Sequence, residues 1–200
     1  MEPSRVELRV IAGNLRGRKI SCIVSEELRP TPQMVREAMF SILGNAVPER
    51  VFFDIFAGTG INGIEALSRG ATTAHFIEAD GKLSANIGAK LREFGVMQRG
   101  LVLKADVYRW AERWFAPSEP VNLFLSPPFI DLTERYAEFL KLIAMLAEKT
   151  AAGSVMTVQA EDGFPTEQLP GTDWDVRTYG RNVLAIWVKP YPSETPTPTT

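Results

Sequence analysis

The chain has 200 residues, of which 45% are hydrophobic and 23% are charged, and its formal net charge is -2. This composition is typical of a globular domain and excludes a collagen, a coiled coil or a wholly disordered chain. One cysteine and one histidine are too few for an internal disulfide or a His/Cys zinc site, so no metal is expected. The chain has no apolar run long enough to span a membrane and no signal-like stretch after Met1, so we expect a cytoplasmic protein.

The first predicted elements are two short strands, residues 6–12 and 18–24, joined by a turn with two glycines. Residues 5–19 contain five Lys or Arg and one acidic residue, which favours contact with an anionic partner. A solvated, charged hairpin explains the same pattern. Apolar residues at helical spacing then predict a helix over 33–43. Residues 1–48 are interpreted as an N-terminal basic hairpin and helix.

From residue 49 onwards, predicted strands and helices alternate. Strands are expected at 51–55, 73–78, 101–105, 121–125 and 154–159, and helices at 61–69, 81–94, 108–115 and 132–148. This alternation predicts a parallel sheet that is covered on both faces. Strands at 174–179 and 183–189 are expected to add a closing antiparallel hairpin, so that residues 49–190 form the main domain. Residues 191–200 are rich in proline and threonine and are expected to be disordered.

A glycine-rich segment from Asp54 to Gly63 follows the first strand of this domain and opens a helix. Gly58, Gly60 and Gly63 match the G-x-G-x-x-G template, in which backbone N–H groups approach a ligand closely. Glu78 comes twenty residues after Gly58, where a carboxylate can accept hydrogen bonds from both hydroxyls of a ribose. These residues fit either NAD or S-adenosylmethionine, and a tight turn without a ligand is the structural alternative.

Two features favour S-adenosylmethionine. Asp54 lies four residues before Gly58, where a carboxylate can face a methionine ammonium through water or backbone and would repel a pyrophosphate. The chain also has no room for the substrate domain of a dehydrogenase. Asp106 is expected to accept from the adenine amine and, compatibly, to cap the next helix. The predicted cofactor residues are Asp54, Phe56, Ala57, Gly58, Thr59, Gly60, Glu78, Ala79 and Asp106.

A second chemically informative segment, Ser126-Pro127-Pro128-Phe129, ends the fourth strand of the domain. Its two prolines fix a rigid turn and leave nearby carbonyls free to accept hydrogen bonds. Carbonyl acceptors beside the Phe129 ring suit a planar base with an exocyclic amine. A plain proline-terminated strand is the alternative.

Taken together, the motifs resemble those of the RsmD-like bacterial rRNA guanine-N2 methyltransferases. The resemblance covers about residues 9–189 and is carried by Arg9-Val10-Ile11-Ala12-Gly13, Arg16-Gly17-Arg18-Lys19, Arg29-Pro30-Thr31, Val35-Arg36-Glu37, Asp54–Gly60, Glu65–Ala71 and Ile77–Asp80. It implies an α/β class I methyltransferase fold, with a Rossmann-like, seven-stranded, mostly parallel sheet and an N-terminal β-hairpin. The implied reaction moves a methyl group from S-adenosylmethionine to the N2 amine of a guanine. The implied substrate is small-subunit ribosomal RNA or its assembly particle, and we expect a monomer.

The resemblance also assigns residues to the RNA. Ser126, Pro127, Pro128 and Phe129 would hold the acceptor base, and Arg16, Arg18, Lys19, Arg29 and Arg36 would contact RNA. An ordinary surface pair with Glu37 is the alternative for Arg36. Ser126 departs from the family, which has Asp or Asn there to accept from the target amine, and a serine hydroxyl is shorter and neutral. A non-catalytic RNA-binding assembly factor is therefore the rival hypothesis, and an NAD-dependent oxidoreductase is a more distant one.

Overall fold

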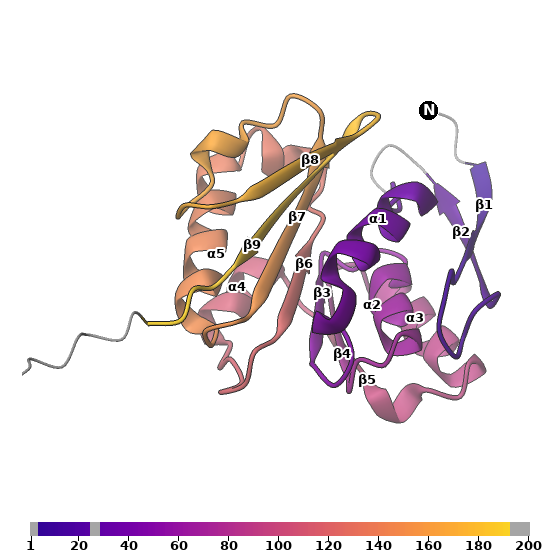
Figure 1. The fold of residues 1–200 in the computed structure, drawn as a ribbon. Coiled ribbons are helices and arrows are strands. Elements are labelled where there is room, and N and C mark those ends of the chain that lie inside the picture. The colour runs from indigo at the N-terminus through magenta and orange to yellow at the C-terminus, as the bar shows by residue number, and fades with distance from the viewer. Residues whose placement is uncertain (1–3, 25–28, 193–200) are drawn as a thin grey trace, which may run out of the picture.

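The fold was obtained as a computed structural model that describes residues 4–24 and 29–192 (Figure 1). Its central sheet has seven strands in the order β5-β4-β3-β6-β7-β9-β8. The strands are β3 (Phe52–Ile55), β4 (Ala74–Glu78), β5 (Gly100–Lys104), β6 (Asn122–Leu125), β7 (Val155–Glu161), β8 (Asp175–Tyr179) and β9 (Asn182–Val188). The first five are parallel, and the β8–β9 hairpin is antiparallel at one edge. The predicted seven-stranded, mostly parallel sheet is confirmed.

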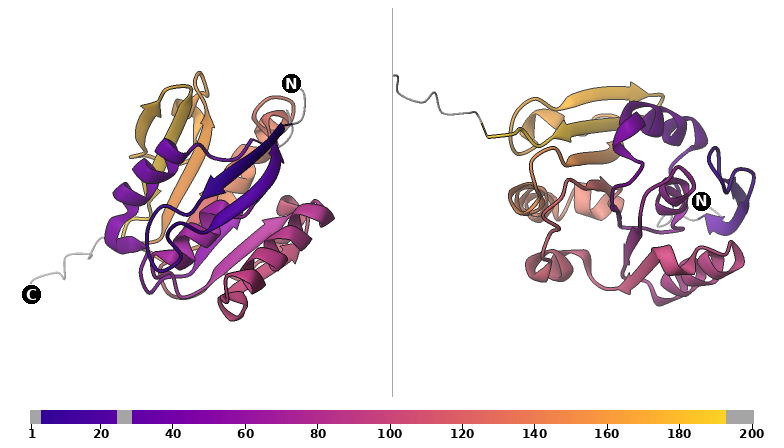
Figure 2. Two further views of the ribbon diagram at one scale, coloured as in Figure 1. Left: turned by 90° about the vertical axis from the view of Figure 1, so that its right-hand side faces the viewer. Right: turned by 60° about the horizontal axis from the view of Figure 1, so that its bottom comes forward.

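Helices cover both faces of this sheet (Figures 1 and 2). One face carries α1 (Gln33–Leu43), α2 (Ile61–Ser68) and α3 (Gly81–Glu93), and the other carries α4 (Val107–Arg113) and α5 (Tyr136–Lys149). Four short 3-10 segments complete the described elements: η1 (Gly44–Ala46), η2 (Met97–Arg99), η3 (Phe129–Leu132) and η4 (Thr166–Gln168). The helix predicted over 132–148 begins at Tyr136, because the residues before it form η3 and a turn. None of the described helices is both long and apolar enough to cross a membrane.

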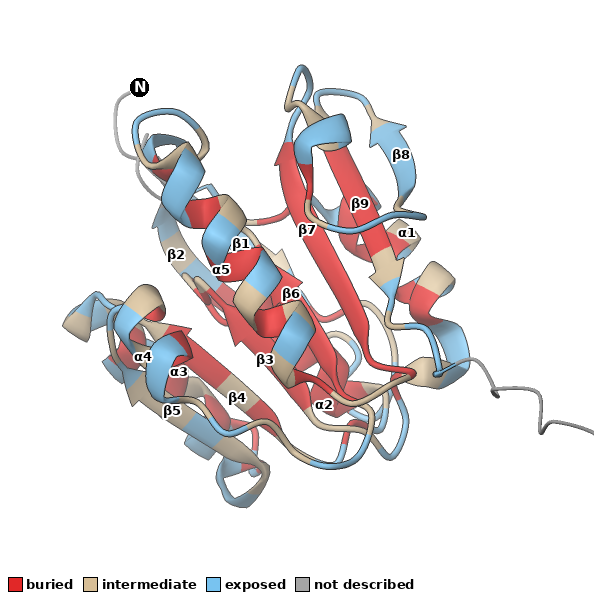
Figure 3. Cartoon of the chain, turned by 90° about the vertical axis from the view of Figure 1, so that its left-hand side faces the viewer, coloured by how far each residue is buried: buried red, intermediate tan, exposed pale blue. Residues whose placement is uncertain are grey.

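Burial follows the position of each strand in the sheet (Figure 3). Every residue of β3 and β6 is buried, as expected for central parallel strands covered on both faces. Neighbouring residues of β3 pack on opposite faces, so Phe52 contacts the α1 side and Phe53 contacts the α4–α5 side. The edge strands β5 and β8 are largely exposed or half-buried.

The N-terminal hairpin is a separate two-stranded sheet of β1 (Ser4–Arg9) and β2 (Lys19–Val24). It lies on the same face as α2 and α3, and Val10 packs with their apolar side chains. The first strand was predicted to reach residue 12 but ends at Arg9. The backbone N–H groups of Ile11 and Ala12 instead donate to the buried carboxylate of Glu65 in α2, at 2.7 and 3.1 Å. The disorder predicted for 191–200 falls, from residue 193 on, outside the described residues.

Gly13 fixes the hairpin loop against α2, and its replacement provides a test of this attachment. Its φ is +82°, and a Cβ there would lie 1.8 Å from the backbone oxygen of Ser68. We expect Gly13→Ala to lower the free energy of unfolding by about 2–3 kcal/mol, through backbone strain and the clash together. Gly17 is the matched control, because its φ is +85° and a Cβ there meets nothing within 4 Å. Gly17→Ala should cost about 1 kcal/mol in chemical denaturation. Equal costs for the two variants would contradict the attachment.

Candidate active site

A cavity of about 560 Å³ opens at the carboxyl ends of the parallel strands. It lies beside the β3–β6 pair. The strands β4 and β5 are added on one side of β3, and β6 and β7 are added on the other, so the strand order reverses here. Ligand sites of open α/β sheets occur at this kind of switch point. The walls come from the segments after β3, β4, β5 and β6, from the end of β7, and from Arg29–Pro32, which precede α1. The fold thus brings both predicted motif segments to one cavity.

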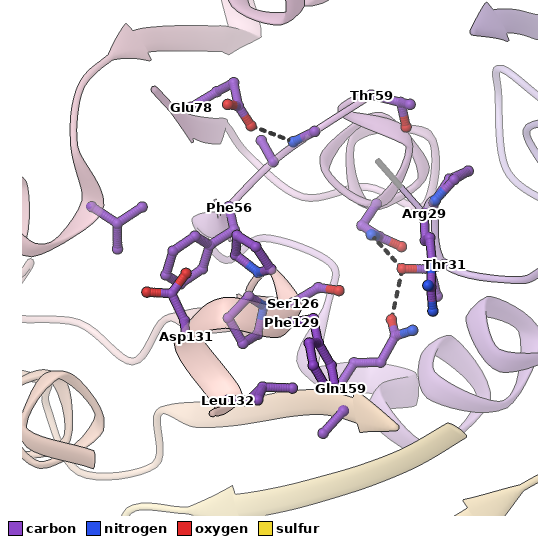
Figure 4. A pocket seen from close by; sticks show the side chains of 18 of the residues that line it. Arg29, Thr31, Phe56, Thr59, Glu78, Ser126, Phe129, Asp131, Leu132 and Gln159 are labelled. Atoms are coloured by element: carbon purple, nitrogen blue, oxygen red, sulfur yellow. Dashed lines mark hydrogen bonds between the residues drawn. The ribbon is translucent and has the colours of Figure 1, made fainter. Parts of the chain in front are cut away.

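The glycine loop and Glu78 are joined on one wall of this cavity (Figure 4). Glu78 Oε2 accepts the N–H of Gly58 at 2.7 Å, and Oε1 accepts the N–H of Asp80 at 2.8 Å. A carboxylate has about four lone-pair sites, so each oxygen keeps one acceptor site. Phe56 has a φ of +61°, a strained conformation for a residue with a side chain, and it turns the chain into the loop.

Seven of the nine predicted cofactor residues line the cavity: Phe56, Ala57, Gly58, Thr59, Glu78, Ala79 and Asp106. Asp106 also accepts the N–H of Arg109 at 3.0 Å and caps α4, so its two predicted roles are compatible. Gly60 does not line the cavity. It begins α2 with a φ of +74°, and a Cβ there would lie 2.9 Å from Ile87. Its place is explained by the turn and by close packing.

Asp54 was predicted to face the cofactor through water or backbone, and the structure gives its side chain no direct access to the cavity. Its side chain is fully buried and does not line the cavity. Oδ2 accepts the N–H of Gly63 at 2.9 Å, and Oδ1 has no hydrogen-bond partner among the described residues. Burial raises the pKa of Asp54 to about 8. The carboxyl supports the first turn of α2 from beneath the glycine loop, because β3 points this side chain towards the helix layer and away from the cavity.

The raised pKa of Asp54 predicts a pH dependence of stability. Between pH 4 and pH 8 the folded state holds a proton that the unfolded state has lost, so stability falls as pH rises through this window. The slope of one such group is at most about 1.4 kcal/mol per pH unit. We expect Asp54→Asn to remove this part of the slope in urea denaturation measured at pH 5, 6 and 7. A slope equal to that of the parent protein would contradict the burial-raised pKa.

The predicted acceptor segment forms another wall of the cavity. Ser126, Pro127, Pro128 and Phe129 all line it, and Phe129 is 63% exposed at the rim. A polar chain faces the cavity beside them: Thr31 Oγ1 donates to Gln159 Oε1 at 2.7 Å, and Asn62 Nδ2 donates to Thr31 Oγ1 at 3.1 Å (Figure 4). Hydrogen-bonding groups and an exposed ring therefore meet where the fourth parallel strand ends.

The predicted RNA residues fall into two groups. Arg16, Arg18 and Lys19 are exposed on the hairpin and its loop, and Arg29 is exposed at the rim of the cavity. Lys19 pairs with Glu7 at 2.8 Å, and Arg29 pairs with Glu161 at 2.5 Å.

The predicted RNA contact of Arg36 is wrong. This residue is 1% exposed, and it donates to the carbonyls of Thr31 at 2.7 Å and Arg9 at 3.0 Å. Its guanidinium ties the start of α1 to the hairpin, so neither the RNA contact nor a surface pair with Glu37 describes it.

The wall residues missed by sequence reasoning include Asn62 and Gln159 of the polar chain and one further cluster, formed by Tyr108, Asp131 and Arg135. Tyr108 donates its hydroxyl to Asp131 Oδ1 at 2.6 Å, although 23 residues separate them. The sequence held one clue, the spacing of four between Asp131 and Arg135, which is the spacing of an ion pair on a helix. Within residues 4–24 and 29–192, no group of three or more His, Cys, Asp or Glu side chains is placed to hold a metal ion.

Comparison with known proteins supports the predicted resemblance. A family model described as "Conserved hypothetical protein 95" matches residues 8–188. The ribosomal RNA small subunit methyltransferase D of Escherichia coli is 31% identical over 163 residues, which are 80% of this chain and 79% of that protein. A solved structure of the putative methyltransferase yhhF from Escherichia coli has a TM-score of 0.74 at 25% identity, and covers 92% of this chain and 99% of its own.

A more distant solved structure shows the same fold. The RNA methyltransferase from Salinibacter ruber, in complex with S-adenosyl-L-homocysteine, has a TM-score of 0.57 at 21% identity. The likeness covers 84% of this chain and 97% of that chain. These neighbours confirm the predicted α/β methyltransferase fold.

Proposed function

Because the chain belongs to the Conserved hypothetical protein 95 family, we propose that it methylates ribosomal RNA with S-adenosylmethionine as the methyl donor. The predicted resemblance to the RsmD-like methyltransferases is confirmed by this membership and by the relatives. The finer proposal is that the acceptor is the exocyclic N2 amine of a guanine in small-subunit RNA. The observation that carries it is the meeting of the Glu78–Gly58 wall and the Ser126–Phe129 wall in one cavity.

The cofactor wall fits S-adenosylmethionine. Glu78 has acceptor sites for the two ribose hydroxyls, Asp106 lines the cavity where it can accept from an adenine amine, and Phe56–Thr59 would enclose the methionine part. Bound S-adenosylmethionine supplies a methyl group on a sulfonium, which is already activated for transfer. The residues of this chain therefore need to position the acceptor, and neither a metal nor a covalent intermediate is required of them.

The acceptor wall fits a planar base with an amine. In this proposal the Ser126 hydroxyl and the Pro127 carbonyl accept the two amine hydrogens, and the Phe129 ring contacts the base. Hydrogen bonds from the amine to these oxygens orient the nitrogen lone pair towards the methyl group. A base inside a helix cannot enter such a cavity, so the target nucleotide must be unpaired or flipped out of its stack.

The basic hairpin is proposed to contact RNA phosphates through Arg16, Arg18 and Lys19. Such contacts release counterions, so the association constant falls as salt is added. In a plot of its logarithm against the logarithm of the salt concentration, each contact adds roughly 0.7–0.9 to the downward slope. Replacing all three residues by alanine should lower the measured slope by about 2. The matched control replaces Arg113 and Lys141, exposed on the opposite face, and should change it by less than about 1. Equal changes in filter-binding titrations would contradict the hairpin contact.

Calorimetric titration tests the cofactor assignment. We expect micromolar binding of S-adenosylmethionine and S-adenosylhomocysteine, and no binding of NAD. Binding of NAD alone would support the oxidoreductase hypothesis. Binding of RNA without binding of either methionine compound would support the assembly factor.

A further inference from the structure

The acceptor segment, Ser126 to Leu132, is tied to the core at its two ends, where the Ser126 N–H donates to the Ile55 carbonyl at 3.4 Å and Leu132 packs on the α4–α5 side. Its prolines provide no N–H groups, and Thr133 Oγ1 donates only locally, to the carbonyls of Phe129 at 3.1 Å and Ile130 at 3.4 Å. Phe129 and Ile130 are 63% and 48% exposed. Asp131 is the exception, because its side chain points inward and is only 3% exposed. A buried carboxylate needs partners, so the partners of Asp131 help to hold the middle of this segment.

The hydrogen-bonding partner of Asp131 comes from the cofactor side of the cavity. Tyr108 lies in α4, two residues after Asp106, and donates its hydroxyl to Asp131 at 2.6 Å. Its ring also meets the edge of Phe56, with centroids 6.2 Å apart. Tyr108 therefore contacts the glycine loop with its ring and the acceptor segment with its hydroxyl.

Arg135 completes the cluster by compensating its charge. Its guanidinium lies 4.2 Å from the centroid of the Tyr108 ring and 3.4 Å from the Asp131 carboxylate. Burial and the neighbouring carboxylate raise the pKa of Tyr108, which keeps its hydroxyl protonated as a donor. Arg135 also pairs with Glu138 at 2.7 Å, so its guanidinium is shared between two carboxylates. The cluster is thus a hydrogen bond between two walls of the cavity, with a cation beside its buried carboxylate.

We propose that Tyr108 and Asp131 are positioning residues for methyl transfer. Their hydrogen bond holds the Ser126–Phe129 segment at a fixed place relative to the glycine loop, so that the acceptor amine meets the methyl group. This inference rests on the proposed function. The bond also links α4, which is capped by the proposed adenine residue Asp106, to the wall that holds the base. A shift of about 1 Å in such positioning can cost about 10²-fold in rate.

The test removes the hydroxyl and keeps the ring, with Tyr108→Phe. We expect the Kd of S-adenosylhomocysteine to stay within about threefold of the parent value, because the ring contacts remain. Hydrogen–deuterium exchange at residues 129–133 should become at least about tenfold faster. The single-turnover rate at saturating RNA should fall about 10- to 100-fold. Asp131→Asn keeps an acceptor for Tyr108, so its single-turnover rate should fall at most about threefold. Asp131→Ala removes the acceptor and should show the same fall in rate as Tyr108→Phe.

Tyr136→Phe is the matched control. It removes another tyrosine hydroxyl, which donates to the carbonyl of Pro165 at 3.3 Å and does not line the cavity. Exchange at 129–133 that is the same in Tyr108→Phe and Tyr136→Phe would overturn the proposal, as would faster exchange with an unchanged single-turnover rate. If the parent protein transfers no methyl group to any ribosomal particle, the proposed function fails, and the exchange measurement still decides whether the bond holds the segment.

Discussion

Replacing Glu78 with glutamine is expected to weaken S-adenosylmethionine binding by at least about 10²-fold. The two oxygens of Glu78 accept the N–H groups of Gly58 and Asp80, and the amide nitrogen of glutamine cannot accept either. The glutamine NH2 group would then face the backbone N–H of Gly58 or Asp80, donor against donor. The ribose hydroxyls would also lose a charged acceptor. A hydrogen bond to a charged group contributes about 1.5–3 kcal/mol. Loss of the charged acceptor for both ribose hydroxyls therefore accounts for the expected rise in Kd.

Titration calorimetry measures this change, and Asp80 offers a matched control. The Asp80 carboxylate caps α3 by accepting the N–H groups of Lys82 and Leu83, and it does not line the cavity. Asparagine also caps helices well, so Asp80→Asn should bind S-adenosylmethionine within about threefold of the parent protein. A Kd for Glu78→Gln inside the same limit, with the fold intact, would show that Glu78 does not hold the ribose.

Replacing Ser126 with aspartate or asparagine is expected to raise the rate of methyl transfer by up to about 10²-fold. The serine hydroxyl lines the cavity but extends one bond less than a carboxylate or amide oxygen. A longer acceptor, charged in aspartate, would hold the amine closer to the transfer geometry. Ser126→Ala removes the acceptor and should lower the rate at least about tenfold.

Single-turnover assays with saturating RNA and cofactor give this comparison directly, because they exclude product release. The single-turnover rate is expected to be highest with aspartate or asparagine at position 126, lower with serine and lowest with alanine. Equal rates for serine and alanine, with aspartate no faster, would mean that the side chain at position 126 does not contact the amine. The Pro127 carbonyl would then be the acceptor to examine next.

The fold was predictable because its signals are local. Short apolar runs alternate with amphipathic segments, and the five runs from residue 51 to 159 became the parallel strands β3 to β7 at nearly the predicted places. The errors occur where tertiary contacts override local pattern. The first strand stops at Arg9 because Glu65, more than fifty residues away, takes the N–H groups that would have continued the ladder.

Site residues were predictable where a sequence motif lies at the end of a strand. They were less predictable where the role of a side chain depends on whether the fold buries it. Glu78, Asp106 and Ser126 line the cavity as their positions after strands suggested. Arg36 was misread because a basic residue in a basic region looks exposed, whereas the hairpin covers it. Tyr108 and Asp131 were missed because their bond depends on how α4 and η3 approach each other, which neither segment specifies alone.

We propose above all that this chain methylates a guanine N2 amine in small-subunit ribosomal RNA. The direct measurement incubates the protein and labelled S-adenosylmethionine with small ribosomal subunits, and with their assembly precursors, from cells that lack it. The RNA is then digested, and its nucleosides are identified by mass spectrometry. The account predicts label in N2-methylguanosine at a single position. No incorporation into any particle, or label in a different nucleoside, would contradict it.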